Sequence, residues 1–243
     1  MPVGWRAGLL RCFTVWHAEV RRGLWKSCAR HAKIAVVLEE PKDFCRLWLL
    51  RHPELEIGAS ETAIGAGPAE LSRRGRAQIL RWMELLKDVE VELVSSGPQP
   101  QCHDAARGLA EAKKLEVVVD TRLRDQEMGQ WQGRQWQEIM RDQDGAVRTF
   151  FSEFGDTAAP GGERLGEAVE RMLQWWAETM PKVAGKTVVV VGSGTILTGF
   201  AAAMLGMRLS RCLSLNLPFG GVGILDAFEN GVRISAWNAD VWH

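Results

Sequence analysis

The chain has 243 residues and carries 30 Lys and Arg residues against 30 Asp and Glu residues, so its formal net charge at pH 7 is zero. Hydrophobic residues make up 46% of the chain and charged residues 25%, a composition typical of a soluble globular protein with one large domain. The balanced charge argues against a nucleic-acid-binding protein, because a polyanionic partner requires a surplus of basic residues.

Residues 1–45 differ in composition from the rest and are expected to form a basic N-terminal extension. Up to Lys33 this segment has seven Lys or Arg residues and a single acid, Glu19. Its arginines interrupt every apolar stretch, so a secretory signal is excluded. Three interpretations remain open: a targeting presequence, a basic amphipathic helix on a membrane surface, and an extension that adds no fold.

The five cysteines are scattered, and no two of them form a Cys-x-x-Cys pair; they are Cys12, Cys28, Cys45, Cys102 and Cys212. This pattern excludes a dense disulfide framework and a zinc ribbon, and it is typical of a reducing compartment. We therefore expect a cytoplasmic protein. The His, Cys and carboxylate residues show no metal-ligand spacing, so neither a metal nor a cofactor is expected.

From residue 46 onward the pattern alternates between strands and helices. In the first half we expect a strand over 46–50, a helix over 71–88 with Ser72 as its N-cap, a strand over 89–94, a helix over 105–115 and a strand over 117–119. In the second half we expect helices over 133–154 and 163–180, a strand over 187–191, a helix over 196–205, and strands over 221–227 and 231–237.

Strands that alternate with helices predict an α/β fold, a three-layer sandwich with a mostly parallel central sheet over residues 46–243. The segment 187–207 contains no charged residue, which is also the pattern of a membrane span. Its internal glycines and its change of period favour a strand, a turn and a helix instead, so stable membrane insertion is not expected.

Ligands of such sheets bind at the carboxyl ends of the strands, and Arg51-His52 directly follows the first strand. A guanidinium binds phosphate through two parallel hydrogen bonds, and a neutral imidazole is a competent nucleophile. Taken alone, the dipeptide is equally compatible with a surface arginine beside an incidental histidine.

The Arg51-His52 pair belongs to a series of six segments that follow one another along the chain. They are 47–54, 71–78, Ser95-Ser96-Gly97-Pro98, 122–133, Pro160-Gly161-Gly162-Glu163 and 189–194. In this order they resemble the histidine phosphatase superfamily, in its phosphoglycerate mutase-like branch. Arg134-x-Trp136 and the Pro-Gly-Gly-Glu segment are most similar to α-ribazole phosphatases.

The resemblance implies a metal-independent phosphomonoesterase with a phosphohistidine intermediate and a small phosphorylated metabolite as substrate. By this resemblance His52 is the nucleophile and Arg51 the first phosphate-binding arginine. Asp125 stands at the position of the general acid, with Asp in place of Glu, and Glu127 is the alternative acid. Whether the protein forms a homodimer stays open.

Two positions depart from the family pattern. Gln101 stands where the second phosphate-binding arginine is expected, and Ser193 stands where the second histidine is expected. Losing both cationic groups predicts impaired catalysis. The alternative is a non-catalytic pseudophosphatase that binds a phosphorylated ligand or a protein partner. His103 and the backbone N–H groups near Gly194 are the candidates for partial compensation.

Overall fold

The computed structural model describes residues 44–56, 61–229 and 231–238, all within one compact unit, Lys42–His243. The basic extension expected over 1–45 therefore lies outside the described residues up to residue 43. None of the helices in the described part is long and apolar enough to cross a membrane. The charge-free segment 187–207 is a strand followed by a helix, as predicted.

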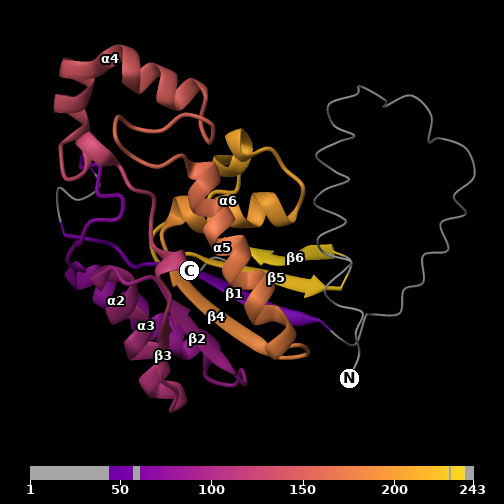
Figure 1. Cartoon of the computed structure of the whole chain (residues 1–243). Coiled ribbons are helices and arrows are strands. Elements are labelled where there is room, and N and C mark those ends of the chain that lie inside the picture. The colour runs from indigo at the N-terminus through magenta and orange to yellow at the C-terminus, as the bar shows by residue number, and fades with distance from the viewer. Residues whose placement is uncertain (1–43, 57–60, 230, 239–243) are drawn as a thin grey trace, which may run out of the picture. The chain divides into compact units, whose positions relative to one another are not determined.

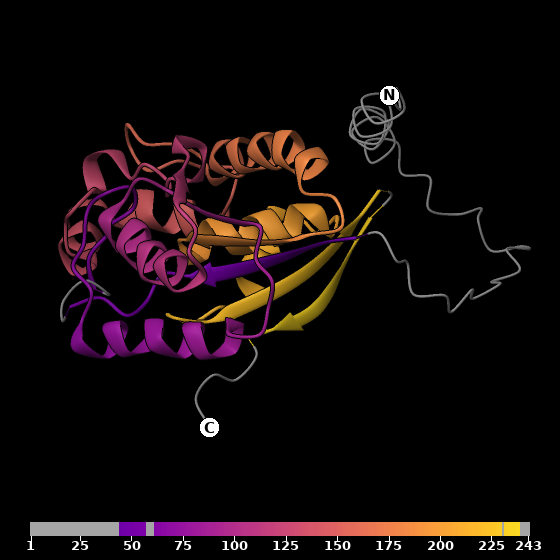
Figure 2. The same ribbon diagram turned by 90° about the horizontal axis from the view of Figure 1, so that it is seen from below.

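A six-stranded sheet forms the centre of the domain (Figure 1). Its strands, in spatial order, are β3 (Val117–Val119), β2 (Leu93–Ser96), β4 (Thr187–Gly192), β1 (Cys45–Arg51), β5 (Val222–Phe228) and β6 (Gly231–Trp237). The first four run parallel, β5 pairs antiparallel with β1, and β6 pairs antiparallel with β5 at the edge of the sheet (Figure 2). The mostly parallel sheet is therefore confirmed.

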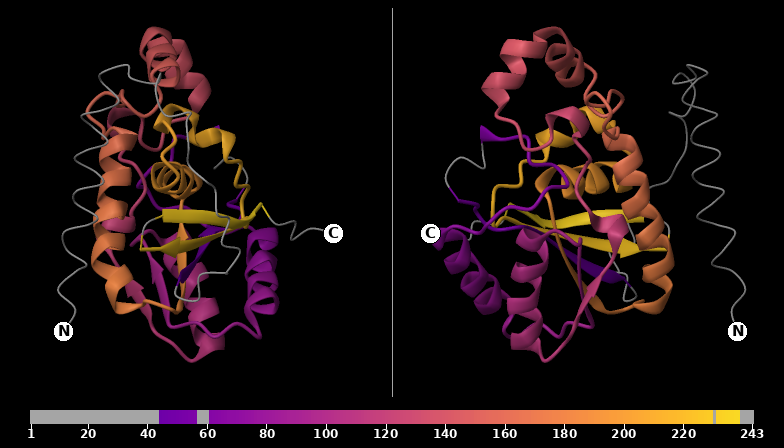
Figure 3. Two further views of the ribbon diagram at one scale, coloured as in Figure 1. Left: turned by 90° about the vertical axis from the view of Figure 1, so that its right-hand side faces the viewer. Right: turned by 60° about the vertical axis from the view of Figure 1, so that its left-hand side comes forward.

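Helices cover both faces of this sheet. On one face lie α2 (Arg73–Leu86) and α3 (Pro100–Lys113), and on the other lie α5 (Leu165–Thr179) and α6 (Gly194–Met204). Figure 3 shows the orange helix α5 and the purple helix α2 on opposite sides of the sheet. The three-layer α/β sandwich is thus confirmed.

The alternation of side chains along β1 explains why two cores form. Leu47 and Leu49 pack with the α5 and α6 side chains, whereas Trp48 and Leu50 pack with those of α2 and α3. Successive side chains of a strand point to opposite faces, so an apolar run of this length is buried on both sides.

Helix α4 (Trp136–Ser152) lies apart from these layers, above the carboxyl-end side of the sheet (Figure 1). Its inner face contributes Ile139, Val147 and Phe150 to the core that α5 and α6 share. Gln143 has non-helical backbone angles, and its Oε1 accepts a hydrogen bond of 2.7 Å from Trp131 Nε1. This bond fixes α4 to the preceding loop at the point where the helix is interrupted.

Several element boundaries differ from the predictions, and the starts of β2, α3 and α6 are three of them. The second strand begins at Leu93 instead of Val89, because the Val89 N–H donates to the Leu86 carbonyl and so stays in the turn that ends α2. Helix α3 begins at Pro100, five residues before the predicted start, since proline suits the first turn of a helix. Helix α6 begins at Gly194 instead of Ile196.

Candidate active site

The carboxyl ends of β1, β2 and β4 meet at one edge of the sheet. Arg51, the last residue of β1, is aligned with Gly192 at the end of β4, and the His52 N–H donates to the Gly192 carbonyl at 2.9 Å. A cavity of about 380 Å³ lies at this edge, a size within the usual range for small-molecule sites. The predicted site residues that line it are Arg51, His52, Gln101, Asp125, Ser193 and Gly194.

His52 is buried, with 6% of its surface exposed. Its Nδ1 lies 3.0 Å from the Pro53 carbonyl oxygen, which can only accept, so Nδ1 carries the proton and Nε2 keeps a lone pair. Burial and the nearby Arg51 charge outweigh this hydrogen bond and lower the pKa of His52 to about 4. The imidazole is therefore neutral at pH 7, as a nitrogen nucleophile must be.

Arg51 is held against the apolar floor of the cavity. Its Nη1 donates to the Leu217 carbonyl at 2.8 Å, and its Cζ lies 3.9 Å from the centre of the Phe219 ring. Burial lowers the pKa of Arg51, while the charge of Asp125 raises it. Arg51 Nε is buried without a hydrogen-bond partner among the described residues. Arg51 also lines the cavity, so the positive charge of its guanidinium favours an anion bound there.

Gly194 gives the Arg51 side chain its room. A Cβ atom at position 194 would lie 2.8 Å from Arg51 Nε and 2.9 Å from Arg51 Cζ, which is closer than a Cβ atom approaches a non-bonded heavy atom in protein structures. The glycine that opens α6 is thus required for the observed position of the guanidinium.

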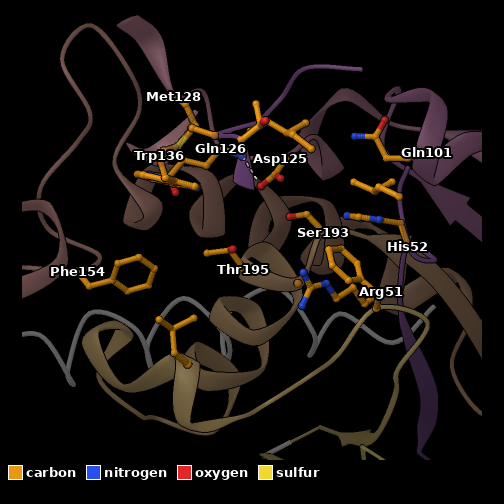
Figure 4. Close-up of a pocket in the computed structure, with 18 of the residues that line it drawn as sticks. Arg51, His52, Gln101, Asp125, Gln126, Met128, Trp136, Phe154, Ser193 and Thr195 are labelled. Carbon is orange, nitrogen blue, oxygen red and sulfur yellow. Dashed lines mark hydrogen bonds between the residues drawn. The ribbon is translucent and has the colours of Figure 1, made fainter. Parts of the chain in front are cut away.

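Asp125 is half-buried on the segment between β3 and α4, and Figure 4 shows it between Gln126 and Ser193. Burial raises the pKa of Asp125, against the lowering effect of hydrogen bonds from Ser193 and from the Gln126 N–H, the latter 2.7 Å long. The positive charges of Arg51 and Arg171 also lower it, but the net shift is upward. A carboxyl group with a raised pKa keeps its proton closer to neutral pH, which suits a general acid.

Ser193 caps the N-terminus of α6. Its Oγ accepts a hydrogen bond of 3.5 Å from the Ile196 N–H, and Gly194 and Thr195 line the cavity beside it. The first N–H groups of a helix have no partner within the helix, and they carry a partial positive charge. The start of α6 therefore presents anion-binding donors to the same cavity as Arg51.

Gln101 lines the cavity, but its amide is engaged elsewhere. Nε2 donates to the Gly67 carbonyl at 3.0 Å, and Oε1 accepts from the Ala69 N–H at 3.1 Å. The side chain thus holds the 67–69 loop against α3 and carries no positive charge toward the cavity.

Two sequence candidates do not reach the site. The His103 side chain, 38% exposed on the first turn of α3, faces Asp104 and is not part of the cavity lining. The Glu127 side chain is also exposed, and its carboxylate lies 3.7 Å from Arg124 Nε. The structure therefore places Asp125, and not Glu127, in the lining of the cavity that His52 also lines.

The sequence analysis missed a set of aromatic residues in the cavity lining: Trp136, Phe150, Phe151 and Phe154. The signal that was available is the cluster of Phe150 and Phe151 at the end of α4 with Phe154 just after it. Within the residues that the structure describes, no group of three or more His, Cys, Asp or Glu side chains is placed to hold a metal ion.

Comparisons with known proteins agree on one family. The family model described as "Histidine phosphatase superfamily (branch 1)" matches residues 47–240. A glucosyl-3-phosphoglycerate phosphatase of Mycobacterium tuberculosis is 29% identical over 214 residues, which cover 82% of this chain and 94% of that protein.

Two solved structures show the same fold. A mycobacterial glucosyl-3-phosphoglycerate phosphatase has a TM-score of 0.74 at 27% identity, over 82% of this chain and 100% of that one. The α-ribazole phosphatase of Shigella flexneri has a TM-score of 0.73 at 20% identity, over 80% of this chain and 96% of that one, and this likeness concerns the fold alone.

Proposed function

Because the chain belongs to the histidine phosphatase superfamily, we propose that it is a phosphomonoesterase in which His52 is the nucleophile. The observation that carries this proposal is the state of His52: buried, neutral, protonated on Nδ1 and adjacent to Arg51 in a cavity of suitable size. Its relatives include phosphatases and mutases that act on small phosphorylated compounds.

The reaction proceeds in two steps. In the first, Nε2 of His52 forms a bond to phosphorus, the bond from phosphorus to the alcohol oxygen breaks, and the protonated Asp125 gives its proton to that oxygen. In the second, Asp125 accepts a proton from water, and the water oxygen displaces His52 from phosphorus, which releases phosphate. Arg51 and the N–H groups at the start of α6 bind the phosphoryl oxygens in both steps.

We infer that this reaction is slow. Among the described residues of the cavity lining, Arg51 is the sole Lys or Arg, and Gln101 and Ser193 provide neutral groups where the family pattern has cations. Removing one positioned donor from a developing negative charge lowers a rate by about 10²–10³-fold. The absence of both cationic groups lowers the rate further, although the effects of groups that work as a unit are less than additive.

Phosphoenzyme trapping tests the nucleophile. The protein is mixed with a reactive aryl phosphate, quenched at alkaline pH where phosphohistidine survives, digested and examined by mass spectrometry. The expected result is a phosphoryl group on His52 in the wild type and none in His52→Ala. Phosphate found on another side chain, or on none, contradicts the proposal.

The engaged amide of Gln101 favours a second candidate, a non-catalytic pseudophosphatase that binds a phosphorylated ligand or a protein partner. In that case the phosphate site is retained for binding, and His52→Ala leaves ligand affinity unchanged. Measurable turnover that His52→Ala abolishes would exclude this candidate.

A further inference from the structure

The cavity has two ends of different chemistry. Figure 4 shows Arg51 and His52 at one end, while Trp136 and Phe154 lie at the other. The first end is the proposed phosphate site, so the second is where the alcohol part of a phosphomonoester would lie.

The second end is formed by four rings, Trp136, Phe150, Phe151 and Phe154, which we call the aromatic wall. Ring centres lie 5.7 Å apart for Trp136 and Phe151, and 5.3 Å apart for Phe150 and Phe151. Phe151 and Phe154 are parallel within 4° at 6.4 Å. These separations fall in the range of favourable aromatic contacts, so the wall is one continuous apolar surface.

Part of this surface is open to solvent. Phe151 is 51% exposed, and Leu213, which lines the same cavity, is 56% exposed. Burying such apolar surface against a ligand is favourable, and a flat ring covers it with the geometry that aromatic side chains prefer.

The charges of the lining point to an uncharged alcohol. In the described part of the lining, the charged side chains are Arg51 and Asp125, and Arg51 is assigned to the phosphate. A carboxylate on the ligand would then lose water without gaining a cationic partner, which is costly. The glycerate carboxylate in the substrate name of the mycobacterial relative would meet this difficulty here.

We propose that the site selects phosphomonoesters of uncharged alcohols that carry an aromatic ring, with the ring against the aromatic wall and the phosphate at Arg51. This inference rests on the proposed function, since it names the substrate class of the same site. It also explains why α4 matters: the helix supplies three of the four rings, with Phe154 just after it, and its position above the strand ends sets the distance between ring and phosphate.

Binding of two phosphonates, which cannot be hydrolysed, tests the inference apart from turnover. One is 1-naphthylmethylphosphonate and the other is 3-phosphonopropionate, which has a carboxylate in place of the ring. Calorimetry on the full chain is expected to give a dissociation constant at least about tenfold lower for the naphthyl compound. Equal affinity, or tighter binding of the carboxylate, overturns the inference.

Two exposed positions on α4 provide a matched pair of variants. Phe151→Ser removes a ring from the wall, and Met140→Ser changes a residue of similar exposure on the same helix that lies outside the lining. Phe151→Ser is expected to raise the dissociation constant of naphthylmethylphosphonate about three- to tenfold and to leave that of inorganic phosphate unchanged. Met140→Ser is expected to change neither dissociation constant. Weaker binding of naphthylmethylphosphonate in both variants, or in neither, contradicts the role of the aromatic wall.

Turnover of 1-naphthyl phosphate, measured in parallel, separates the two proposals. If naphthylmethylphosphonate binds preferentially and no phosphomonoester is hydrolysed, the proposed function fails while the ligand class is supported. If phosphomonoesters are hydrolysed without preference for the ring, the proposed function is supported and the inference fails.

Discussion

His52 combines burial with a hydrogen bond that leaves Nε2 without a proton. Burial acts through the pKa, which falls to about 4, so the free imidazole base is the stable form in the folded protein. The ordinary imidazole of the unfolded chain titrates at about 6.5. The same group therefore links the proposed chemistry to the stability of the fold.

The first prediction concerns this linkage. Between pH 6.5 and pH 4 the unfolded chain binds a proton at His52 and the folded chain does not, so His52 lowers the free energy of unfolding as the pH falls. This loss of stability is absent above about pH 6.5 and reaches its full size, about 3 kcal/mol, by about pH 4. Urea unfolding across this pH range is expected to show a smaller loss of unfolding free energy in His52→Asn than in the wild type. An identical pH dependence in both proteins would contradict the low pKa.

The second prediction concerns Asp125 as the general acid. Asp125→Asn keeps the size of the side chain but removes the proton that the leaving oxygen needs. Turnover of an alkyl phosphate is expected to fall by about 10²–10⁴-fold. Turnover of 4-nitrophenyl phosphate, whose leaving group needs no protonation, is expected to fall far less. Steady-state rates with both substrates check this, with Glu127→Gln as the control, and equal losses in Asp125→Asn would assign Asp125 another role.

At the scale of elements, serine residues cap the N-termini of two helices near the site. Ser193 begins α6, and Ser72 begins α2, where its Oγ accepts from the Gly75 N–H at 2.9 Å and donates to Glu54 Oε1 at 2.9 Å. Ser72 therefore ties α2 to the segment that directly follows His52. The sequence predicted this cap correctly because serine before an apolar helical pattern is a strong local signal.

The third prediction follows from that cap. Ser72→Ala is expected to lower the free energy of unfolding by about 1–2 kcal/mol, because it removes the bond to the first turn of α2 and the bond to Glu54. Chemical denaturation measures the change. Ser152→Ala, at the exposed end of α4, is the matched control and is expected to stay within about 0.5 kcal/mol of the wild type. A change in Ser72→Ala no larger than this would show that the cap is not stabilising.

Strand boundaries were harder to predict than caps. The alternation from Val89 to Val94 is that of a strand, yet Val89 completes the turn after α2, and pairing with β4 begins at Leu93. Alternation marks a half-buried segment, but the partner strand decides where pairing starts. That information lies in Thr187–Gly192, far along the chain, and no local pattern contains it.

At the scale of the whole molecule, topology assembles the site. Arg51 ends β1, Gln101 begins α3 after β2, Asp125 follows β3 and Ser193 follows β4. The parallel order of these strands brings the four residues to one edge. Their convergence could be predicted, since the carboxyl ends of parallel strands meet at the same edge. Two features could not be predicted, because both depend on how α3 packs. They are the hydrogen bonds of Gln101 to the 67–69 loop and the position of His103 outside the cavity.

The aromatic wall was beyond prediction for the same reason. Phe150 and Phe151 lie in the last turn of α4 and Phe154 follows the helix, and such a cluster of phenylalanines is equally typical of residues that are wholly buried in a core. Only the position of α4 above the strand ends turns that cluster toward the cavity (Figure 1). The proposed substrate class thus depends on the arrangement of distant elements.

The central claim is that His52 catalyses phosphoester hydrolysis in a pocket that lacks two cationic groups. The most direct test measures turnover of 1-naphthyl phosphate by the wild type, by His52→Ala, and by the double variant Gln101→Arg and Ser193→His. We predict slow turnover in the wild type, none in His52→Ala, and a gain of about 10²-fold or more in the double variant. Turnover that persists in His52→Ala, or a wild type without any turnover, would contradict the account.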